Sequence, residues 1–497
     1  MNAVIDLHRM AFGPRPGDLD AWNALSGDDN ARHLAYVEQQ LHPETIDDSA
    51  VDQRLTAFPS LKKSQEALWR DYYAAGGGDH TVYQRPLRET ILATFVRAVH
   101  SRRQLLEVLA DFWHNHFNVF AFPWEAAAVW PYYDREVIRG HVLGNFRAML
   151  EAVASSTAML YYLDNIRSTD AGPNENFARE LFELHTLGAT NYLGVRGQEE
   201  VPKDSRGRPT AYVDNDVYEA ARAFTGWTTE NGRFVYRAEW HDRFQKQVLG
   251  LAMGPDRPDL QDGRDVLDAV AHHPGTARHI AEKLCRRLIA DRPPAAVIEN
   301  AAAVFLDRWE APDQLRQVVR AILRSDEYRA TWGEKSKRPF ETAVALLRAT
   351  DGDLPFTPDD SLTNDFLWLY RQTGHELFAR QTPDGYPDTR EAWNDIGSRA
   401  TTWRLIGWLM EQKAGERYLV DAAARTPDGV RSAADIADFW ILRLLGRPME
   451  DKERREIVRF MAQGYQGDLD LPLNEETRSR LQSMVALIAM SPAFSWR

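Results

Sequence analysis

The sequence predicts a mainly α protein, built as a large multi-helix body with long irregular loops and at most a small β ribbon. Apolar residues recur three and four positions apart through most of the 497-residue chain, which is the spacing of an amphipathic helix. Strand signals are sparse, and no apolar run approaches the ~18 residues that a membrane-spanning helix needs. A hydrophobic content of 44% with 27% charged residues is typical of a globular chain.

Helical spacing is clearest in two long segments of the first half of the chain. Residues 89–113 and residues 134–154 each place their apolar side chains on one helical face. The best strand candidate is the stretch GRFVYRAEW at 232–240, so we expect the β ribbon near 192–240. Further helical patterns cover residues 265–290, 298–325, 338–350, 396–412, 434–445 and 451–463.

Three loop-like stretches interrupt these patterns, at 192–212, 351–362 and 380–391. The first is rich in Gly, Pro and charged residues, and we expect it to be a mobile flap. The boundaries indicate four regions, which could all form one domain. They are an N-terminal helical lead-in at 1–80, a central helical body with the candidate site at 81–260, a third helical layer at 261–350 and a C-terminal helical region at 351–497.

Composition and motifs argue against several classes of protein. The net charge is −13 and no basic patch with interleaved aromatics occurs, so we expect no nucleic-acid partner. Cys285 is the only cysteine, which excludes intramolecular disulfides and cysteine-based zinc sites, and we expect it to be buried. The stretch AAGGGDH lacks the Lys-Ser/Thr ending of a phosphate loop, and neither a G-x-S-x-G elbow nor a His-Glu-x-x-His motif occurs. The start does not resemble a signal peptide, so the sequence as written predicts a cytoplasmic protein, although a chain trimmed of its leader would look the same.

The first candidate site segment is DFWHNHFNVF, which holds two histidines two residues apart. At about 100° per helical residue, Glu107, Asp111 and His114 share one stripe, whereas His116 falls on the aromatic side. The two histidines would converge only if the helix ends or deforms near Asn115. The ordinary alternatives are a solvated acidic face for the stripe and a hydrogen-bonded core position for His116.

The second candidate segment is NENFARELFELHTLG. Glu175 and Arg179 have the i, i+4 spacing of an ion pair, and His185 falls on the apolar side, in the last turn before Gly188. The alternative to a binding site is a buried polar network tied to Arg179 or Arg222. Three other polar side chains form a stripe, namely Asn176, Glu180 and Glu183.

Together the two stripes resemble the carboxylate-rich metal sites of helical bundles, although such sites usually contain the acid-x-x-His pair twice and this sequence shows it once. We expect a divalent metal ion, Fe, Mn or Zn, because these ions bind imidazole and carboxylate oxygens. Arg179 and Arg222 would either hold helices in register or bind an anionic group, and with Glu180 they are the candidate catalytic residues. The candidate metal ligands are His114, His116, Glu180, Glu183, His185, His241 and Asp242.

Eight motifs occur in a characteristic order: RMAFGPRPGD, DFWHNHF, AMLYYLDN, NENFARELFELHTLG, DVYEAARAFTGW, HDRFQKQVLG, HHPGTARHIAEKLCRRLI and PDGYP. They resemble the bacterial family called domain of unknown function 1800 from about residue 9 to the C-terminus. Members often carry a twin-arginine export signal, which this chain lacks. Their genes often neighbour those of family 1501, which resembles the alkaline phosphatase and sulfatase superfamily. The chain departs from the family pattern at SSTAML and at Tyr386, where the family tends to have Trp.

From these residues and this resemblance we expect a bacterial helical enzyme with a cleft lined by His and carboxylate side chains. It would be metal-dependent and either hydrolytic or oxidative, with a small-molecule or peptide substrate that the sequence does not identify. The alternative is a non-catalytic helical binding protein that acts with a hydrolase-like partner encoded nearby, for which the 1501 family is the candidate. Neither a nucleic acid nor a membrane span is expected.

Overall fold

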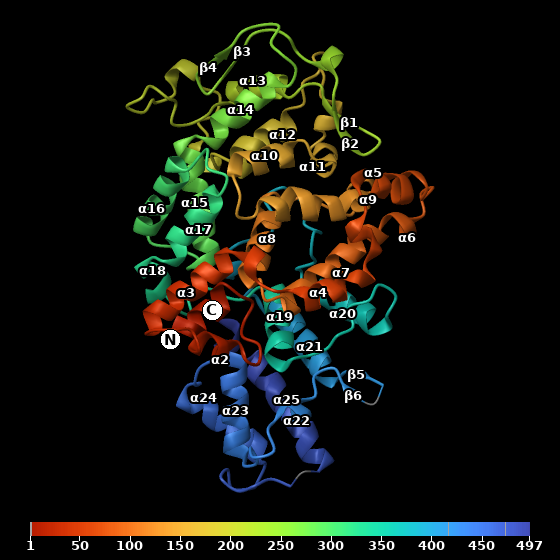
Figure 1. Cartoon of the computed structure of the whole chain (residues 1–497), viewed down its shortest axis with the longest axis vertical. Coiled ribbons are helices and arrows are strands. Elements are labelled where there is room, and N and C mark those ends of the chain that lie inside the picture. Colours follow the sequence, from red (N-terminus) through yellow and green to blue (C-terminus); the bar gives the residue numbers. More distant parts are fainter. Residues whose placement is uncertain (1, 416, 473) are drawn as a thin grey trace.

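The structure is a computed structural model that describes residues 2–415, 417–472 and 474–497. Helices dominate it, as the periodicity predicts, and they are arranged along one long axis (Figure 1). The helices of residues 146–223 lie at one end of this axis and the C-terminal helices lie at the other. The N-terminal helices and the long helices of residues 85–132 occupy the middle, where both chain ends also lie.

The N-terminal lead-in is joined to the middle of the molecule by buried polar contacts. The imidazole of His33 contacts Asp6 through Nδ1 (2.9 Å) and the carbonyl oxygen of Leu323 through Nε2 (3.1 Å). This region is therefore part of the main body and not an independent arm. Its helices are α1 (Asn2–Arg9), α2 (Asp18–Asn23), α3 (Asp29–Leu41), α4 (Ser49–Arg54), α5 (Gln65–Leu68) and α6 (His80–Tyr83).

The single helix expected over 89–113 is two helices, because the chain turns at Ser101. Asp48 accepts hydrogen bonds from the Ser101 hydroxyl (2.7 Å) and from the backbone N–H of Arg102 (2.9 Å), which fixes the turn. A local side-chain contact thus interrupts a continuous apolar pattern. The central helices are α7 (Arg85–His100), α8 (Gln104–His116), α9 (Trp124–Tyr132), α10 (Phe146–Ala154), α11 (Thr157–Tyr162), α12 (Glu175–Glu180) and α13 (Asp214–Ala223).

Three segments continue α-helices as single π-helical turns, a rare geometry that is frequent at functional sites. The third of them follows α12 directly and contains Glu183 and His185, for which the sequence predicts an α-helical register. The side chains after Glu180 are therefore rotated from their expected positions. The π segments are η4 (Trp69–Ala74), η5 (Tyr133–Ile138) and η8 (Leu181–His185).

Strands form three two-stranded antiparallel ribbons among the described residues. The predicted strand near 232–240 is present and pairs Tyr236 with Trp227. The expectation of one ribbon near 192–240 was too narrow, since two ribbons lie beyond it in short turns without a strong alternating pattern. The strands are β1 (Trp227–Glu230), β2 (Arg233–Tyr236), β3 (Lys246–Val248), β4 (Leu251–Met253), β5 (Lys413–Ala414) and β6 (Arg417–Tyr418).

The expected helix at 265–290 is also divided, at the His-His-Pro sequence. His273 is the N-cap of the second helix, and its Nδ1 accepts a hydrogen bond from the backbone N–H of Gly275 (2.9 Å). His272 is in turn the C-cap of the first helix, so the break falls between the two histidines. The remaining helices are α14 (Gln261–Ala271), α15 (Pro274–Leu288), α16 (Ala295–Asp307), α17 (Gln314–Leu323), α18 (Asp326–Ala330), α19 (Pro339–Thr350), α20 (Ser361–Arg371), α21 (Ile396–Glu411), α22 (Ala422–Arg425), α23 (Ala433–Leu445), α24 (Asp451–Ala462), α25 (Glu475–Met490) and α26 (Pro492–Ser495).

One continuous hydrophobic core runs from Ala3 to Phe494 and includes side chains from all four regions that the sequence indicates. Cys285 is fully buried within it, as expected, and burial raises the pKa of its thiol to about 12. A second, small cluster joins Val201 and Ala211, which belong to the 192–212 loop, to Val213 directly after it. Of the helices described, none has the length and apolar character needed to cross a bilayer.

Candidate functional site

The stripe of Glu107, Asp111 and His114 on α8 is present, but it faces the interior. All three side chains line an enclosed cavity of about 20 Å³, together with apolar residues that include Phe340 and Phe378. A cavity of this size has room for about one water molecule. The stripe is therefore not the solvated helix face that its charges would ordinarily indicate.

His114 belongs to a buried ion-pair network that the sequence did not indicate. Its Nε2 donates to Oδ1 of Asp134 (2.9 Å), and Asp134 also accepts from Arg97 and Arg139. Arg139 forms a bidentate pair with Glu107 at 3.0 and 2.8 Å. Burial acts to raise the pKa of Asp134, but Arg139, His114 and Arg97 lower it well below its usual range. The contact of His114 with Asp134 therefore joins α8 to η5 and has a structural role.

Asp111 belongs to a second buried network, although it lies one helical turn from His114. It pairs with Arg287 (3.1 Å) and with Arg338, and both of these arginines also contact Glu341. Glu341 pairs in addition with Arg497 at 3.1 Å. Breaking a buried pair leaves a charge without a partner, so these groups hold α8, α15 and α19 in register.

His116 lies with a different group, as the helical register predicts. Its Nε2 donates to the carbonyl oxygen of His185 (3.1 Å), and its ring lies 6.2 Å from that of His185 and 6.3 Å from that of His279. Burial, followed by the charge of Lys283, lowers the pKa of all three imidazoles, to about 3 for His185 and about 4 for His279. These histidines are therefore neutral at physiological pH.

Lys283 acts on all three of these histidines, and it has no hydrogen-bond or ion-pair partner among the described residues. Burial lowers the pKa of its amine, while the charges of Asp388 and Asp384 act to raise it. The neighbouring Gly188 has a φ of +87°, and a Cβ there would lie 2.8 Å from Nδ1 of His279. This position therefore requires glycine, which lets the end of η8 approach α15.

Glu180 and Glu183 lie together at the junction of α12 and η8. Burial, followed by the charges of Glu183 and Asp384, raises the pKa of Glu180 to about 7. Within the described parts of the chain, Glu180 forms neither a hydrogen bond nor an ion pair. Its neighbour Arg179 points elsewhere, since it pairs with Glu175 (3.1 Å), as the spacing predicts, and with Asp214 (3.4 Å).

Asp384 is brought to Glu180 by a loop that is tied to the end of α8. The amide of Asn118 donates to the carbonyl oxygens of Arg380 (3.0 Å) and Thr382 (2.8 Å). A Cβ on Gly385, whose φ is +73°, would lie 2.3 Å from the carbonyl oxygen of Asn115, so this contact also requires glycine. The loop is thereby fixed although more than 260 residues separate it from α8 in the sequence.

Asp384 and Tyr162 differ from Glu180 in their ionisation. Hydrogen bonds from Thr382 and Arg380 outweigh burial and lower the pKa of Asp384. Burial raises the pKa of Tyr162 to about 12, and its hydroxyl donates to the carbonyl oxygen of Gln381 (2.8 Å). We call Asp384 and the four side chains around it the Glu180 cluster: Tyr162, Glu180, Glu183, Lys283 and Asp384.

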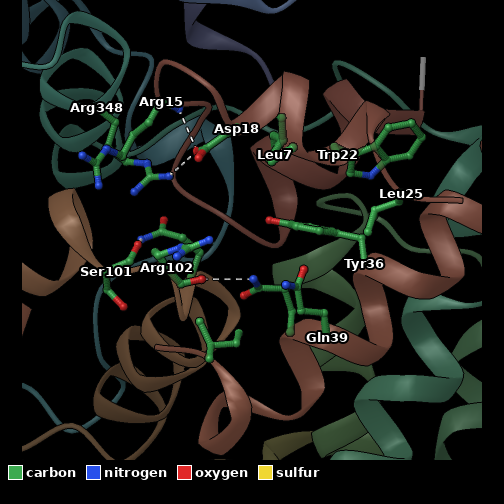
Figure 2. Close-up of a pocket in the computed structure, with 14 residues that line it drawn as sticks. Leu7, Arg15, Asp18, Trp22, Leu25, Tyr36, Gln39, Ser101, Arg102 and Arg348 are labelled. Atoms are coloured by element: carbon green, nitrogen blue, oxygen red, sulfur yellow. Dashed lines mark hydrogen bonds and ion pairs between the residues drawn. The ribbon is translucent and has the colours of Figure 1, made fainter. Parts of the chain in front are cut away.

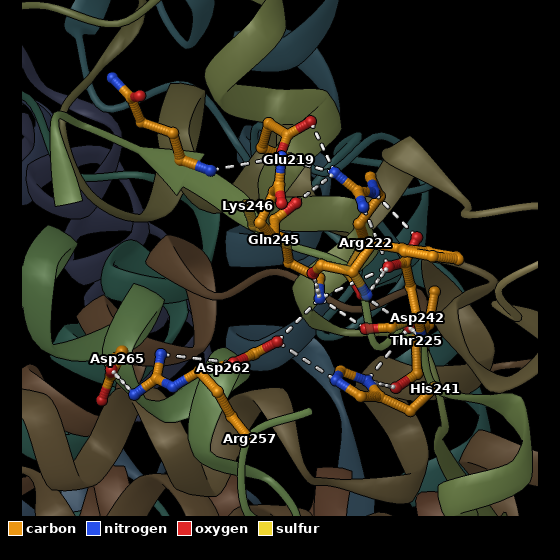
Figure 3. Close-up of polar contacts among 12 residues, drawn as sticks. Glu219, Arg222, Thr225, His241, Asp242, Gln245, Lys246, Arg257, Asp262 and Asp265 are labelled. Carbon is orange, nitrogen blue, oxygen red and sulfur yellow. Dashed lines mark hydrogen bonds and ion pairs between the residues drawn. The ribbon is translucent and has the colours of Figure 1, made fainter. Parts of the chain in front are cut away.

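Arg222, His241 and Asp242 form a third group, where every charge has an opposite partner (Figure 3). Arg222 binds Asp242 with two hydrogen bonds, of 2.8 and 3.0 Å. His241 contacts Asp262 (3.3 Å), and the fully buried amine of Lys246 donates to the same carboxylate (2.8 Å). We call these five residues the Asp242 network, and its geometry is that of a structural clamp between α13, β3 and α14.

The seven expected metal ligands are thus distributed over separate places: His114 at Asp134, His116 with His185, Glu180 with Glu183, and His241 with Asp242. Over residues 2–415, 417–472 and 474–497, no three His, Cys, Asp or Glu side chains are arranged so that they could hold one metal ion. A shared site for all seven does not form, and the metal ion itself stays a prediction.

Sequence reasoning did not select Tyr162, His279, Lys283 or Asp384. Each of them lies in a motif that marks the family resemblance, AMLYYLDN, HHPGTARHIAEKLCRRLI or PDGYP. Their place in the family motifs is the signal that could have identified them. Four motifs that are distant in sequence meet at this cluster. Their meeting is the strongest reason to place a site here.

Comparison with known proteins gives a family without a named activity. Neither the curated proteins nor the solved structures include a match to the chain. A family model described as "Protein of unknown function (DUF1800)" matches residues 6–496. That span covers nearly all of the 497 residues, and the chain belongs to this family.

Proposed function

We propose that this protein is an enzyme that catalyses a hydrolytic reaction by proton transfer at the Glu180 cluster. Glu180 would donate the proton, since a carboxyl group with a pKa of about 7 is protonated in a large share of molecules at neutral pH. Asp384 would act as the ionised carboxylate, because its pKa is lowered. Two carboxyl groups with pKa values shifted in opposite directions are a recurrent basis of acid–base catalysis.

The surroundings of the cluster support this assignment. Glu180 is half-buried and has no ion-pair partner among the residues that the structure describes, so its carboxyl group is available for proton transfer. Lys283 has no partner in the described part of the chain, and its charged form could bind an anionic group of the substrate or the charge that develops in the transition state. The single observation that carries the proposal is structural: a Glu180 carboxyl group without a hydrogen-bond or ion-pair partner among the described residues lies near Asp384, which is held by Thr382 and Arg380.

The test is a screen of chromogenic esters, glycosides and phosphate esters with wild-type protein and Glu180→Gln. Removing a general acid should lower the rate on the order of 10²- to 10⁴-fold. The matched control is Glu175→Gln, which removes a carboxylate from the same helix that pairs with Arg179 away from the cluster. Because Glu180 acts when protonated, the wild-type rate should fall as the pH rises through about 7. Equal rates for the wild type and Glu180→Gln would contradict the proposal.

A binding protein is the second candidate, and the C-terminal half of the chain favours it. Large apolar side chains there are exposed, among them Trp368 (48%), Trp403 (45%) and Leu487 (40%). A partner from the 1501 family would bury some of this surface. Calorimetric titration with such a partner should then show binding that Trp403→Ala weakens and Glu180→Gln leaves unchanged.

A further inference from the structure

A second cavity, outside the Glu180 cluster, lies among the N-terminal helices. Its volume is about 130 Å³, and its walls come from α1, α2, α3, the α7–α8 turn and α19 (Figure 2). Arg15 and Asp18, from the motif RMAFGPRPGD, lie on one side of it. The proposed function gives this motif no role.

The cavity carries more positive than negative charge. Arg15, Arg102 and Arg348 line it, and Asp18 is the one carboxylate among its lining residues. Arg348 is buried and donates to Asp18 (3.0 Å) and to the carbonyl oxygen of Gly13 (2.7 Å). Burial, helped by the charge of Arg15, lowers the pKa of Arg348 to about 10, although the charge of Asp18 acts to raise it. Asp18 is thus paired with Arg348. Arg15 donates to the carbonyl oxygen of His100 (2.9 Å) and lies 3.8 Å from Asp351, so the excess positive charge at the cavity is that of Arg102.

Two donors remain free to bind a ligand. The Arg102 guanidinium is exposed and has no partner in the described parts of the chain. The Tyr36 hydroxyl likewise has no partner there, and Figure 2 shows it pointing into the space between Arg102 on one side and Asp18 on the other. Burial raises the pKa of Tyr36 above its ordinary value, so this hydroxyl stays a donor. Tyr36 is 9% exposed, and a ligand oxygen would accept the hydrogen bond that its hydroxyl does not make within the described parts of the chain.

The rest of the cavity wall is partly polar, with Gln39, Gln40, Ser101 and Gln104, and partly apolar. Leu7, Trp22, Leu25 and Ile46 line it, and Trp22 and Leu25 lie beside Tyr36 in Figure 2. The indole N–H of Trp22 donates to Asp6 (2.9 Å), so the ring is fixed in place. A ligand would therefore present one charged end to the donors and an apolar body to these side chains.

We propose that this cavity binds a small carboxylate with a compact apolar body, such as an aryl carboxylate. The carboxylate would accept hydrogen bonds from the Tyr36 hydroxyl and the Arg102 guanidinium, and the ring would contact Trp22 and Leu25. The size is suitable, because an apolar cavity of about 150 Å³ in another protein holds benzene. Nothing in this assignment depends on the proposed reaction at Glu180.

The experiment is calorimetric titration of the full chain with benzoate, with benzamide as the uncharged analogue and inorganic phosphate as a second anion. Tyr36→Phe and Arg102→Met should each lower the benzoate affinity about tenfold, because each removes a hydrogen bond to a charged group. The matched controls are Tyr465→Phe and Arg206→Met, two exposed positions outside the cavity, which should bind benzoate as the wild type does. Benzamide should bind at least about tenfold more weakly than benzoate.

Leu25→Trp provides an independent test, because it fills the apolar part of the cavity and removes no donor. It should abolish benzoate binding, and its melting curve shows whether the fold is retained. Absence of wild-type binding at about 10 mM benzoate, where even a weak fragment is detected, would overturn the proposal. Equal binding of benzamide, tighter binding of phosphate, or unchanged affinity in Tyr36→Phe and Arg102→Met would overturn it as well.

Discussion

The Asp242 network and the Glu180 cluster are both rich in charged groups, yet they differ in how those charges are paired. In the Asp242 network, Arg222, Lys246 and His241 each contact a carboxylate within 3.3 Å. In the Glu180 cluster, neither Glu180 nor Lys283 has a partner among the described residues, and both have pKa values shifted toward the neutral form. Paired charges stabilise a fold, whereas unpaired charges of shifted pKa are available for chemistry. The comparison teaches that a motif rich in charge can serve either purpose.

The largest expected effect on the free energy of unfolding comes from a substitution in the Asp242 network. Lys246→Met removes a fully buried ammonium and leaves Asp262 without its 2.8 Å partner. Breaking a buried pair should lower the free energy of unfolding by about 3–5 kcal/mol, measured by urea denaturation. The control Lys203→Met, at an exposed lysine, should change it little. If Lys246→Met left the free energy of unfolding nearly unchanged, the paired charges of the Asp242 network could not be called structural, and the distinction from the Glu180 cluster would fail.

Substitution of Glu180 should have a smaller, pH-dependent effect on the free energy of unfolding, and it should raise this free energy. Its folded-state pKa is raised to about 7 from an ordinary 4.5, so its contribution to stability is present below pH 4.5 and is lost as the pH rises through 7. At pH 8, Glu180→Gln should therefore be more stable than the wild type. Allowing for the partial exposure of Glu180, the gain is on the order of 1 kcal/mol. At pH 4 the two proteins should unfold alike, and a Glu180→Gln variant that is less stable at pH 8 would mean that its charge is paired after all.

The divalent ion that the sequence predicts can sharpen the comparison further. Among the expected ligands, Glu180 and Glu183 lie together and have no ion-pair partner within the described ranges, so a bound ion should depend on them. Added Mn, Fe or Zn should raise the melting temperature of the wild type by a few degrees through preferential binding to the folded state. Glu180→Gln and Glu183→Gln should lose this response, while His241→Gln should keep it. A wild type that responds to none of these ions, and that contains no metal when purified, would remove the metal prediction and leave the proton-transfer proposal.

The smallest expected effect on stability is that of proteolytic cleavage in the 192–212 loop. Val195 is 89% exposed and Arg196 and Arg206 are also exposed, so trypsin should cleave here first. The loop residues Val201 and Ala211 pack together with Val213 in the small cluster, and this packing should hold the cut ends in place. The nicked protein should therefore keep its melting temperature. Mass spectrometry of the early fragments identifies the site, and earlier cleavage in the C-terminal region would contradict the flap.

Local spacing predicted much of the fold but only part of the site. Helical periodicity correctly placed Glu107, Asp111 and His114 on one face and His116 on another. It could not show that the first face is buried, because periodicity identifies the residues on a face and not what covers them. Asp384 could not be placed beside Glu180 by spacing, since 204 positions separate them and a loop makes the approach.

The π turn at Leu181–His185 has a consequence for how this family can diverge. Such a turn holds one residue more than an α-helical turn, so loss of one codon there would restore an ordinary helix. The deletion would rotate Glu180 by about 100° relative to the helix end at His185. It would leave the α12 cap and Gly188 in place, because both lie outside the turn. Relatives one residue shorter between Asn174 and Gly188 should thus keep the architecture while presenting a different side chain to Asp384.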